Sequence, residues 1–292
     1  MEPNFFIIAG SEKCGTTSLF QYLADSKLFN ISIQKETDYF RKSVTPTIES
    51  YIEEFSASDL NKFFLEASPG YLTDSEIVAD KIKNTLTNHH LFFCLRDPTD
   101  RFISSYNFRK SRLYIPTEMS LDDYFEQCCL FEQGKETDDR LDDWSLRTLD
   151  GGNYFKHLTN FERSGIKFTI IPFNDLAKNP RGILGSILRL ANITSDFFDQ
   201  YSFEKNNVTI GFKNKTLQRI ALKVNKKLEY FWVKNPKVKK SALNLYRMLN
   251  GKKAPRKNIE DPVYSKIKEY YKKDYEMYNK DLLPKYRINI SD

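Results

Sequence analysis

Residues 4–22 read NFFIIAGSEKCGTTSLFQY, and this stretch decides the fold of the chain. The apolar run at 5–9 has the length and composition of a buried parallel strand. A loop bounded by Gly10 and Gly15 follows it, and from Thr16 onward apolar residues recur at helical spacing. A strand, a glycine loop and a helix start in this order predict a phosphate site, because the N–H groups and the dipole of the helix both favour an anion.

The loop has the glycine spacing of a nucleotide-binding P-loop but not its lysine. Gly10 and Gly15 fit G-x-x-x-x-G-K-[ST], but Gly15 is followed by Thr16, and the lysine of the loop is Lys13, two residues before the second glycine. This arrangement resembles the loop with which sulfotransferases bind the 5′-phosphosulfate of 3′-phosphoadenosine 5′-phosphosulfate (PAPS). The loop alone leaves three interpretations open: a kinase-like protein, a sulfotransferase, or a strand–turn–helix without a ligand.

The composition is that of a globular protein. The 292 residues are 40% hydrophobic, enough for one α/β domain or a domain with an appendage. No run approaches the ~18 apolar residues of a transmembrane helix, and Met1 to Asn4 lack the features of a signal peptide. The cysteines suit neither a zinc site nor a disulfide framework, so we expect free thiols and a cytoplasmic protein. They are Cys14, Cys94, Cys128 and Cys129.

Charge is distributed unevenly along the chain. Residues 205–292 hold 23 Lys and Arg against 8 Asp and Glu, a net charge of +15, whereas residues 1–204 carry −9. A basic tail on an acidic body favours an anionic partner near the C-terminal end. The tail has no recognisable nucleic-acid-binding module, so we expect no nucleic acid partner.

Strands and helices alternate through much of the chain. Strands are predicted at residues 5–9, 28–33, 62–65, 91–95 and 167–172. Helices are predicted at residues 46–55, 74–86, 98–110, 180–191, 217–231, 239–249 and 262–278. The alternation predicts an α/β fold of P-loop-like, three-layer type, with a central parallel sheet flanked by helices and a helical, basic C-terminal region. We expect a core at 1–205 and a C-terminal region at 206–292 that packs on the core or extends it.

Four charged side chains follow closely on predicted strands. They are Lys13, Glu36, Glu66 and Arg96. In a parallel sheet the carboxyl ends of the strands meet at one edge, where ligands bind, so we expect all four at one rim. Arg96 stands where a P-loop nucleotidase commonly has an acid that holds Mg²⁺, and a guanidinium suits an anion rather than a metal. Asp97 is better suited to cap the next helix, and we expect no metal.

The segment at 95–106, LRDPTDRFISSY, resembles the second signature of the sulfotransferases, R-x-P-x-x-R-x-x-S-x-Y, at full spacing. The resemblance implies that Arg96 and Ser104 hold the 3′-phosphate of PAPS. It also implies that the first loop holds the 5′-phosphosulfate. The loop residues concerned are Lys13, Cys14, Gly15, Thr16, Thr17 and Ser18.

Two further segments are similar to those of carbohydrate-type sulfotransferases. Residues 35–40, KETDYF, match K-E-x-x-x-F, which implies that Glu36 is the general base. Residues 66–72, EASPGYL, are similar to E-K-x-P-x-Y, but Ala67 replaces the lysine. Glu66 is the alternative base, and we expect it to position Lys13 or a substrate hydroxyl.

Histidine is a less suitable base here. His89 and His90 precede the predicted fourth strand, so about five strand residues, or roughly 16 Å, separate them from the active rim. His157 lies on a predicted helix with no claim to the rim. Lys13 has a different expected role, because a lysine beside the leaving bridging oxygen stabilises the charge that develops there in the transition state.

These observations favour a PAPS-dependent sulfotransferase that acts on a hydroxyl of a carbohydrate, glycolipid or other small molecule. The alternatives are a nucleotide-dependent small-molecule kinase and a non-catalytic anion-binding protein. In the basic tail, apolar stripes at 217–231 and 262–278 are expected to pack on the sheet with their lysines in solvent. The competing hypothesis is that Lys223, Lys226 and Lys227 attract an anionic acceptor or a membrane surface, which makes the protein peripheral to the membrane.

Overall fold

The computed structural model describes residues 2–56, 59–203, 210–228, 231–232, 235–253 and 261–290. The chain divides into two compact units. The sheet unit comprises Met1–Arg101, Asp150–Asn207 and Lys268–Asp292, and the helix-rich unit comprises Phe102–Leu149 and Val208–Ile267. Both units take residues from each side of position 205, and the expected division of the chain into parts at that position stays a prediction.

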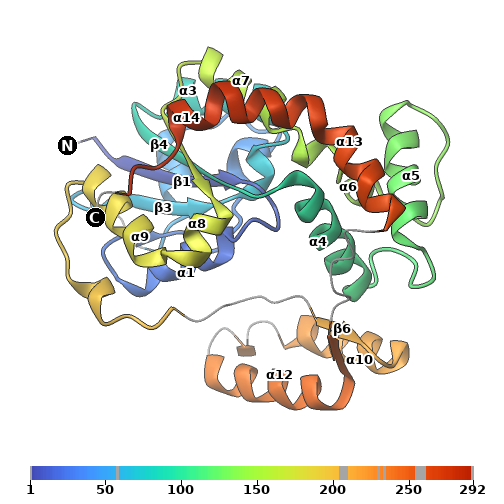
Figure 1. Ribbon diagram of the computed structural model, residues 1–292. Coiled ribbons are helices and arrows are strands. Elements are labelled where there is room, and N and C mark those ends of the chain that lie inside the picture. The colour runs from blue at the N-terminus through green and yellow to red at the C-terminus, as the bar shows by residue number, and fades with distance from the viewer. Residues whose placement is uncertain are drawn as a thin grey trace. The chain divides into compact units, whose positions relative to one another are not determined.

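The sheet unit is built on five parallel strands in the order β2-β3-β1-β4-β5 (Figure 1). The strands are β1 (Asn4–Gly10), β2 (Asn30–Ile31), β3 (Phe64–Ala67), β4 (Asn88–Leu95) and β5 (Phe168–Pro172). All five predicted strands are present, although β2 is shorter than expected, β3 begins two residues later and β4 begins three residues earlier. Beside β5, Ile288 donates its N–H to the carbonyl oxygen of Ile170 at 2.8 Å, so the C-terminal segment returns to the sheet.

Helices cover both faces of the sheet, which confirms the predicted three-layer α/β fold. Those with all their residues in the sheet unit are α1 (Thr16–Asp25), α2 (Ile48–Ile52), α3 (Ser75–Thr85), α7 (Tyr154–Arg163), α8 (Phe173–Lys178), α9 (Pro180–Leu190) and α14 (Leu283–Tyr286). Shorter turns are η1 (Tyr39–Arg41), η2 (Pro69–Tyr71), η3 (Asp150–Gly152), η4 (Phe197–Asp199) and η5 (Tyr278–Leu282).

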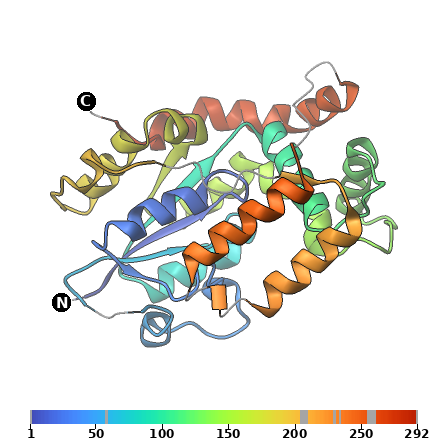
Figure 2. The ribbon, with the colours of Figure 1, turned by 90° about the horizontal axis from the view of Figure 1, so that it is seen from below.

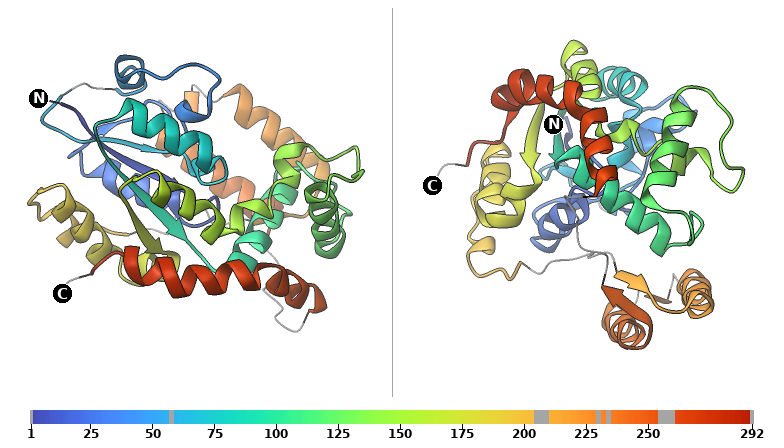
Figure 3. Two further views of the ribbon diagram at one scale, coloured as in Figure 1. Left: turned by 90° about the horizontal axis from the view of Figure 1, so that it is seen from above. Right: turned by 45° about the vertical axis from the view of Figure 1, so that its right-hand side comes forward.

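Two hydrophobic cores lie on opposite faces of the sheet because successive strand residues point to opposite sides. Phe5 and Ile7 of β1 belong to the core that contains α3 and α7. Phe6 and Ile8 belong to the core that contains α1 and α9. Figure 2 shows α1 lying over the strands, and the left view of Figure 3 shows α3 and α7 over them from the other side.

The connections that follow β1 and β4 lead toward opposite edges of the sheet. From β1 it continues through α1 to β2 on one side of the sheet, and from β4 it continues to β5 on the other side. Because β1 and β4 are neighbours, their carboxyl ends flank the point at which the strand order reverses. Ligands of open parallel sheets bind at such a point, which is therefore the expected place for a ligand of this chain.

The helix-rich unit contains helices and one antiparallel pair of short strands. Its elements are α5 (Leu121–Glu132), α6 (Asp143–Leu146), β6 (Ile210–Phe212), α10 (Lys215–Lys227), α12 (Pro236–Asn250) and β7 (Gly251–Lys253). Two helices have residues in both units, α4 (Pro98–Ser111) and α13 (Pro262–Met277). The right view of Figure 3 shows α10 and α12 side by side next to the β6–β7 pair. Within the described residues, no helix has the length and apolar character needed to cross a membrane.

One predicted apolar face in the sheet unit is partly wrong. Helical spacing over 74–86 predicts Ile77, Ile82 and Leu86 to face inward, and Ile82 and Leu86 are indeed buried. Ile77 is exposed, because five residues in a helix correspond to about 140° of rotation and place it on a different side from Ile82. Val78 occupies the inward position instead.

The two stripes of the basic tail have different outcomes. Ile267 and Tyr271 of α13 are buried, and so is Tyr278, the first residue of η5, as expected of a segment that packs through its apolar face. The apolar stripe of 217–231, most of which lies in α10, is exposed, and its expected packing on the sheet stays a prediction. Its residues are Leu217, Ile220, Val224 and Leu228, followed by Phe231, which is also exposed.

Candidate active site

The loop that follows β1 is held at Ser11. The N–H of Ser11 donates to the carbonyl oxygen of Cys94 in β4 at 2.7 Å, and its hydroxyl donates to the carbonyl oxygen of Gly151 at 3.1 Å. The N–H of Cys14 donates back to the carbonyl oxygen of Ser11 at 3.2 Å, which closes the loop on itself. The loop is therefore fixed to the strand on the other side of the switch point.

Gly15 is required by the backbone where the loop enters α1. Its φ is +87°, in the left-handed region that favours glycine, and an added Cβ would lie 3.1 Å from the ring of Phe173. Gly15 is the N-cap of α1 and makes no side-chain cap, and the first turn holds no acidic residue. The N–H groups of the first helical turn and the positive end of the helix dipole therefore suit an anion.

The predicted donor-binding residues of this loop differ in their access to a ligand. Lys13 is half-buried, with a left-handed backbone (φ 67°), and Thr17 and Ser18 are also half-buried in the first turn of α1. Thr16 is buried and is the first residue of that helix. The binding of an anion by these side chains stays a prediction.

Cys14 is the exception among them. Its side chain is fully buried, with its sulfur 3.9 Å from the hydroxyl of Tyr154. Burial raises the pKa of the Cys14 thiol, although Arg101 acts in the opposite direction. The N–H of Cys14 already donates within the loop, so this residue serves the shape of the loop rather than offering its side chain to a ligand.

Arg96 lies directly after β4, at the other side of the switch point. Its guanidinium carbon is 5.1 Å from the centre of the Phe173 ring, and its Nη2 is 3.7 Å from Oδ2 of Asp100. The Phe173 ring, which lies close to Gly15, thus also packs against the guanidinium of Arg96. Asp97 accepts the N–H of Asp100 at 3.0 Å, which confirms its predicted role as the cap of α4. Ser104 is half-buried in α4 and belongs to the helix-rich unit.

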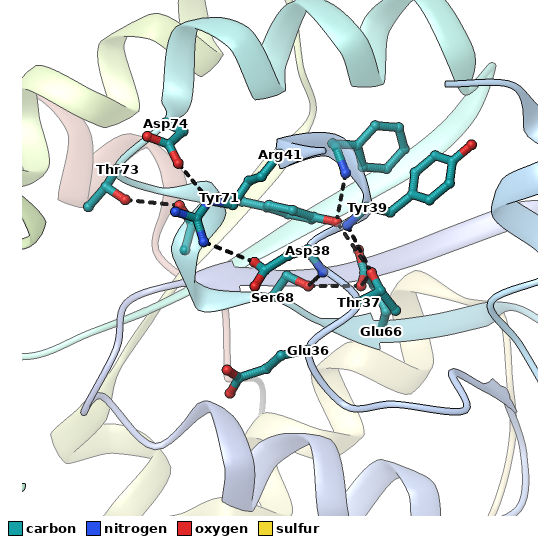
Figure 4. A network of polar contacts seen from close by, with 12 residues as sticks. Glu36, Thr37, Asp38, Tyr39, Arg41, Glu66, Ser68, Tyr71, Thr73 and Asp74 are labelled. Atoms are coloured by element: carbon teal, nitrogen blue, oxygen red, sulfur yellow. Dashed lines mark hydrogen bonds and ion pairs between the residues drawn. The ribbon is translucent and has the colours of Figure 1, made fainter. Parts of the chain in front are cut away.

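Glu36 lies in the segment that follows β2. Its carboxylate pairs with the ammonium of its neighbour Lys35, and the side chain is 55% exposed. The carbonyl oxygen of Lys35 accepts the N–H of Ala67, so the segment still runs beside β3 at this point. Figure 4 shows Glu36 pointing away from the polar network around Glu66. This carboxylate is accessible from solvent.

The expectation that Glu66 stands at the rim is wrong. Because β3 begins two residues later than predicted, Glu66 lies within the strand, and its side chain is fully buried. Its carboxylate accepts hydrogen bonds from the hydroxyls of Thr37, Tyr51 and Ser68, the latter two at 3.0 Å. A buried carboxylate with several donors is a structural anchor that solvent does not reach.

The residues around Glu66 hold the segment that carries Glu36 (Figure 4). Ser68, which donates to Glu66, accepts the N–H of Asp38 at 3.0 Å. Thr37 accepts the N–H of Tyr39 at 3.2 Å, and Tyr71 accepts the N–H of Phe40 at 3.3 Å. Three successive amides, at 38, 39 and 40, are thus fixed by side chains gathered around one carboxylate.

Burial controls the protonation of this network. It raises the pKa of the Glu66 carboxyl, whereas the hydrogen bonds from Thr37, Tyr71, Tyr51 and Ser68 lower it. Burial and the neighbouring Glu66 raise the pKa of Tyr51 and of Tyr71 well above the ordinary value of 10. The tyrosine hydroxyls therefore remain protonated, as donors to the carboxylate must be.

The strand order separates the predicted rim residues into two groups. Lys13 and Arg96 follow the adjacent strands β1 and β4. Glu36 follows β2, and β3 lies between β2 and β1. Neighbouring strands are about 4.8 Å apart, so the Glu36 segment is roughly 10 Å from β1 along the rim. The roles assigned to Glu36 and to the loop residues stay predictions.

The histidines lie away from this rim or are buried. His89 and His90 lie at the amino end of β4, as predicted, although they belong to the strand and do not precede it. Burial lowers the pKa of both, that of His90 to about 4. His157 is buried, 3.1 Å from both Oγ of Ser75 and Oδ1 of Asp150, where it joins α7 to its neighbours.

Sequence reasoning missed several residues that shape the site. Phe173 underlies both Gly15 and Arg96, and Thr37, Tyr51 and Ser68 bind Glu66. A hydroxyl pattern of this kind has no period or spacing that would identify it. Within the described ranges, no group of three or more His, Cys, Asp or Glu side chains could hold a metal ion.

Residues 3–280 match the model of the sulfotransferase domain family. The chain belongs to this family, which confirms the resemblance seen in the loop at 10–15 and in the segment at 95–106. The parallel sheet, the loop after β1 and Arg96 all lie within the matched residues.

Two individual sulfotransferases are similar to this chain, one in part of its sequence and one in its fold. The chain is 35% identical over 109 residues to the membrane-associated sulfotransferase kil1 of Dictyostelium discoideum, which covers 36% of this chain and 23% of that protein. The match thus spans about a quarter of the relative's length. The fold is similar to the crystal structure of a sulfotransferase from Alicyclobacillus acidocaldarius, with a TM-score of 0.56, 17% identity, and coverage of 80% of this chain and 95% of that one.

The contrast between the two glutamates gives a stability prediction. Glu66→Leu leaves at least three buried hydroxyls without their acceptor, at about 1–3 kcal/mol each, so we expect the free energy of unfolding to fall by about 3 kcal/mol or more. Glu36→Leu, at an exposed position, should change it by no more than about 0.5 kcal/mol. Urea unfolding of the two variants and the parent measures the difference. Equal losses in both variants would contradict the anchoring role of Glu66.

Proposed function

We propose that this chain is a PAPS-dependent sulfotransferase that moves a sulfuryl group to an acceptor hydroxyl. The observation that carries the proposal is the pair of cationic groups at the switch point, Lys13 in the loop after β1 and Arg96 after β4. PAPS has an anionic group at each end of its ribose, so two separated cations suit it. Membership in the sulfotransferase family supports the same donor.

The donor-binding roles follow from the position of each group. The first turn of α1, with Thr16, Thr17 and Ser18, would bind the 5′-phosphosulfate through N–H groups and hydroxyls. Gly15 lets the backbone approach the ligand. Arg96 and Ser104 would bind the 3′-phosphate. The contact of Arg96 is the stronger of the two because it is assisted by charge.

The transfer itself needs a stabilised leaving group and an acceptor for one proton. The bond between sulfur and the bridging oxygen of the phosphosulfate breaks, and a bond from sulfur to the acceptor oxygen forms. Lys13 would stabilise the charge that develops on the bridging oxygen. Glu36 would take the proton of the attacking hydroxyl, because a hydroxyl of high pKa must lose its proton as it attacks. No metal takes part in these steps.

Glu36 rather than Glu66 is proposed as the base. Glu66 is enclosed by hydroxyl donors inside β3, whereas Glu36 is solvent-accessible on the adjoining segment. Glu66 is instead proposed to position the Glu36 segment through the amides at 38–40. This role replaces the expectation that Glu66 positions Lys13 or a substrate hydroxyl.

The proposed acceptor is a hydroxyl of a carbohydrate or glycolipid. This follows from the similarity of residues 35–40 to carbohydrate-type sulfotransferases. Ala67, next to Glu66, stands where those enzymes carry a lysine, so part of the acceptor site differs. We also propose a cytoplasmic location, peripheral to the membrane, because the cysteines suit free thiols and the basic tail suits an anionic surface. The name of the Dictyostelium relative includes membrane association.

A ligand-induced thermal shift separates this function from the kinase alternative. PAP, the desulfated product of PAPS, should raise the unfolding temperature without Mg²⁺, because a ligand that binds only the folded state stabilises it. ATP with Mg²⁺ should raise it less at the same concentration. A larger shift with ATP and Mg²⁺, and none with PAP, would replace the proposed function by phosphoryl transfer.

Lys13 is predicted to matter for turnover and little for folding. Lys13→Ala should lower kcat by about 10²–10³, the usual effect of removing one group that stabilises developing charge. The rate of PAP release from PAPS with a competent acceptor measures this. Lys83→Ala, at an exposed position in the last turn of α3, is the matched control and should turn over like the parent. A Lys13→Ala variant as active as that control would remove the leaving-group argument.

The base assignment predicts a separation of kcat from donor affinity. Glu36→Gln should lower kcat by about 10²–10⁴, the contribution of a general base, with the affinity for PAP unchanged. Steady-state kinetics and calorimetric titration with PAP give the two quantities. If kcat stays at the parent value, the proton must pass to water or to another group.

A further inference from the structure

The basic helices α10 and α12 expose apolar stripes. In α10 and at its C-cap, Leu217, Ile220, Val224 and Leu228 recur at helical spacing on one side, and Ile220 is 53% exposed. In α12, Val238, Leu245 and Leu249 do the same, with Met248 beside them, and Met248 and Leu249 are 78% and 64% exposed. A helix that packs in a globular protein usually buries such a stripe. We call these two stripes together the apolar face of α10 and α12.

The buried sides of these helices are polar. Gln218 of α10 is buried and donates to the carbonyl oxygen of Ser111 at 2.6 Å, and it accepts the hydroxyl of Tyr246 of α12. Asn250, also buried, donates to the Tyr246 hydroxyl at 2.9 Å and to the carbonyl oxygen of Asn214 at 3.1 Å. The polar contacts fix the helix pair in its unit, which leaves the apolar residues outward.

The same segment is strongly cationic. Residues 213–253 contain 13 Lys and Arg and one acidic residue, Glu229. On α10, Lys223, Lys226 and Lys227 are exposed, and by helical rotation Lys223 and Lys227 stand at the border of the apolar stripe. An exposed surface that combines large aliphatic side chains with an almost unopposed positive charge requires a partner that offers both apolar volume and negative charge.

An anionic lipid surface meets both requirements. Aliphatic side chains enter the boundary between head groups and acyl chains, while lysines lie among the negative head groups. A nucleic acid or an acidic glycan would use the cations but leave the leucines and Met248 in water. We propose that the apolar face of α10 and α12 docks on the surface of a bilayer that contains anionic lipids. This inference does not depend on the proposed sulfuryl transfer.

Vesicle co-sedimentation of the full chain tests the docking. The probes are vesicles of phosphatidylcholine alone and vesicles of phosphatidylcholine with phosphatidylserine. The parent should sediment with the phosphatidylserine vesicles, remain in solution with phosphatidylcholine alone, and lose binding as salt rises, because exposed charges are screened within about 8 Å at physiological ionic strength. Absence of binding to the anionic vesicles would overturn the proposal.

Two variants distinguish docking through the apolar face from attraction by charge alone. Changing Ile220, Val224, Leu245 and Leu249 together to Gln keeps the net charge and should weaken vesicle binding at least about tenfold. The matched control changes Ile33 and Ile77 to Gln, two exposed isoleucines of the sheet unit, and should bind vesicles like the parent. If the fourfold variant binds as the parent does, the apolar face is not the docking surface.

Two further measurements keep the outcome clear. Titration with PAP should give the same affinity in all variants, so a loss of vesicle binding with unchanged PAP binding reports on docking, and a failure to bind PAP reports on the proposed function instead. Sedimentation velocity tests the competing occupant, a second copy of this chain. A parent dimer that the fourfold change dissociates, together with no vesicle binding, would assign the face to self-association and overturn the proposal.

Discussion

The hydrogen bond from the N–H of Ser11 to the carbonyl oxygen of Cys94 is the constraint on which the site depends. It joins the end of β1 to β4 at 2.7 Å, where the regular pairing of the two strands is interrupted between Ile8 and Gly10. The interruption turns the chain out of the sheet and into the loop, so that α1 begins with its N-terminus at the switch point. Because Arg96 comes two residues after Cys94, the same bond relates the loop to the guanidinium.

A second constraint lies inside the sheet, at Glu66. A buried charge is unfavourable unless it is paired or hydrogen-bonded, and here hydroxyls from three different segments supply the hydrogen bonds. The consequence extends beyond stability, since the side chains that satisfy Glu66 also bind the amides that follow Glu36. One buried carboxylate thereby shapes the backbone beside an exposed one.

The sequence predicted the central strands well because their residues form uninterrupted apolar runs. Residues 5–9 and 91–95 are buried, but the polar residues Asn88, His89 and His90 at the start of β4 were not predicted as strand. The prediction failed for β3, where the strand was expected to end at Leu65 and Glu66 was placed just after it. A carboxylate within a buried strand needs hydrogen-bond partners. Here Thr37 and Tyr51 supply them, and they are 29 and 15 residues away in the sequence, so no local pattern identifies them. Helical spacing likewise identified the stripe of α10 but not whether anything covers it.

The central claim is that the cations at the switch point bind the two anionic ends of the donor. Calorimetric titration of PAP into the parent and into Arg96→Ala, without Mg²⁺, tests it most directly, with Arg163→Ala in the last turn of α7 as a control. The account predicts that PAP binds the parent and the control alike, and that Arg96→Ala binds at least about tenfold more weakly, because a charge-assisted contact contributes about 1.5 kcal/mol or more. Equal dissociation constants for all three proteins would contradict it.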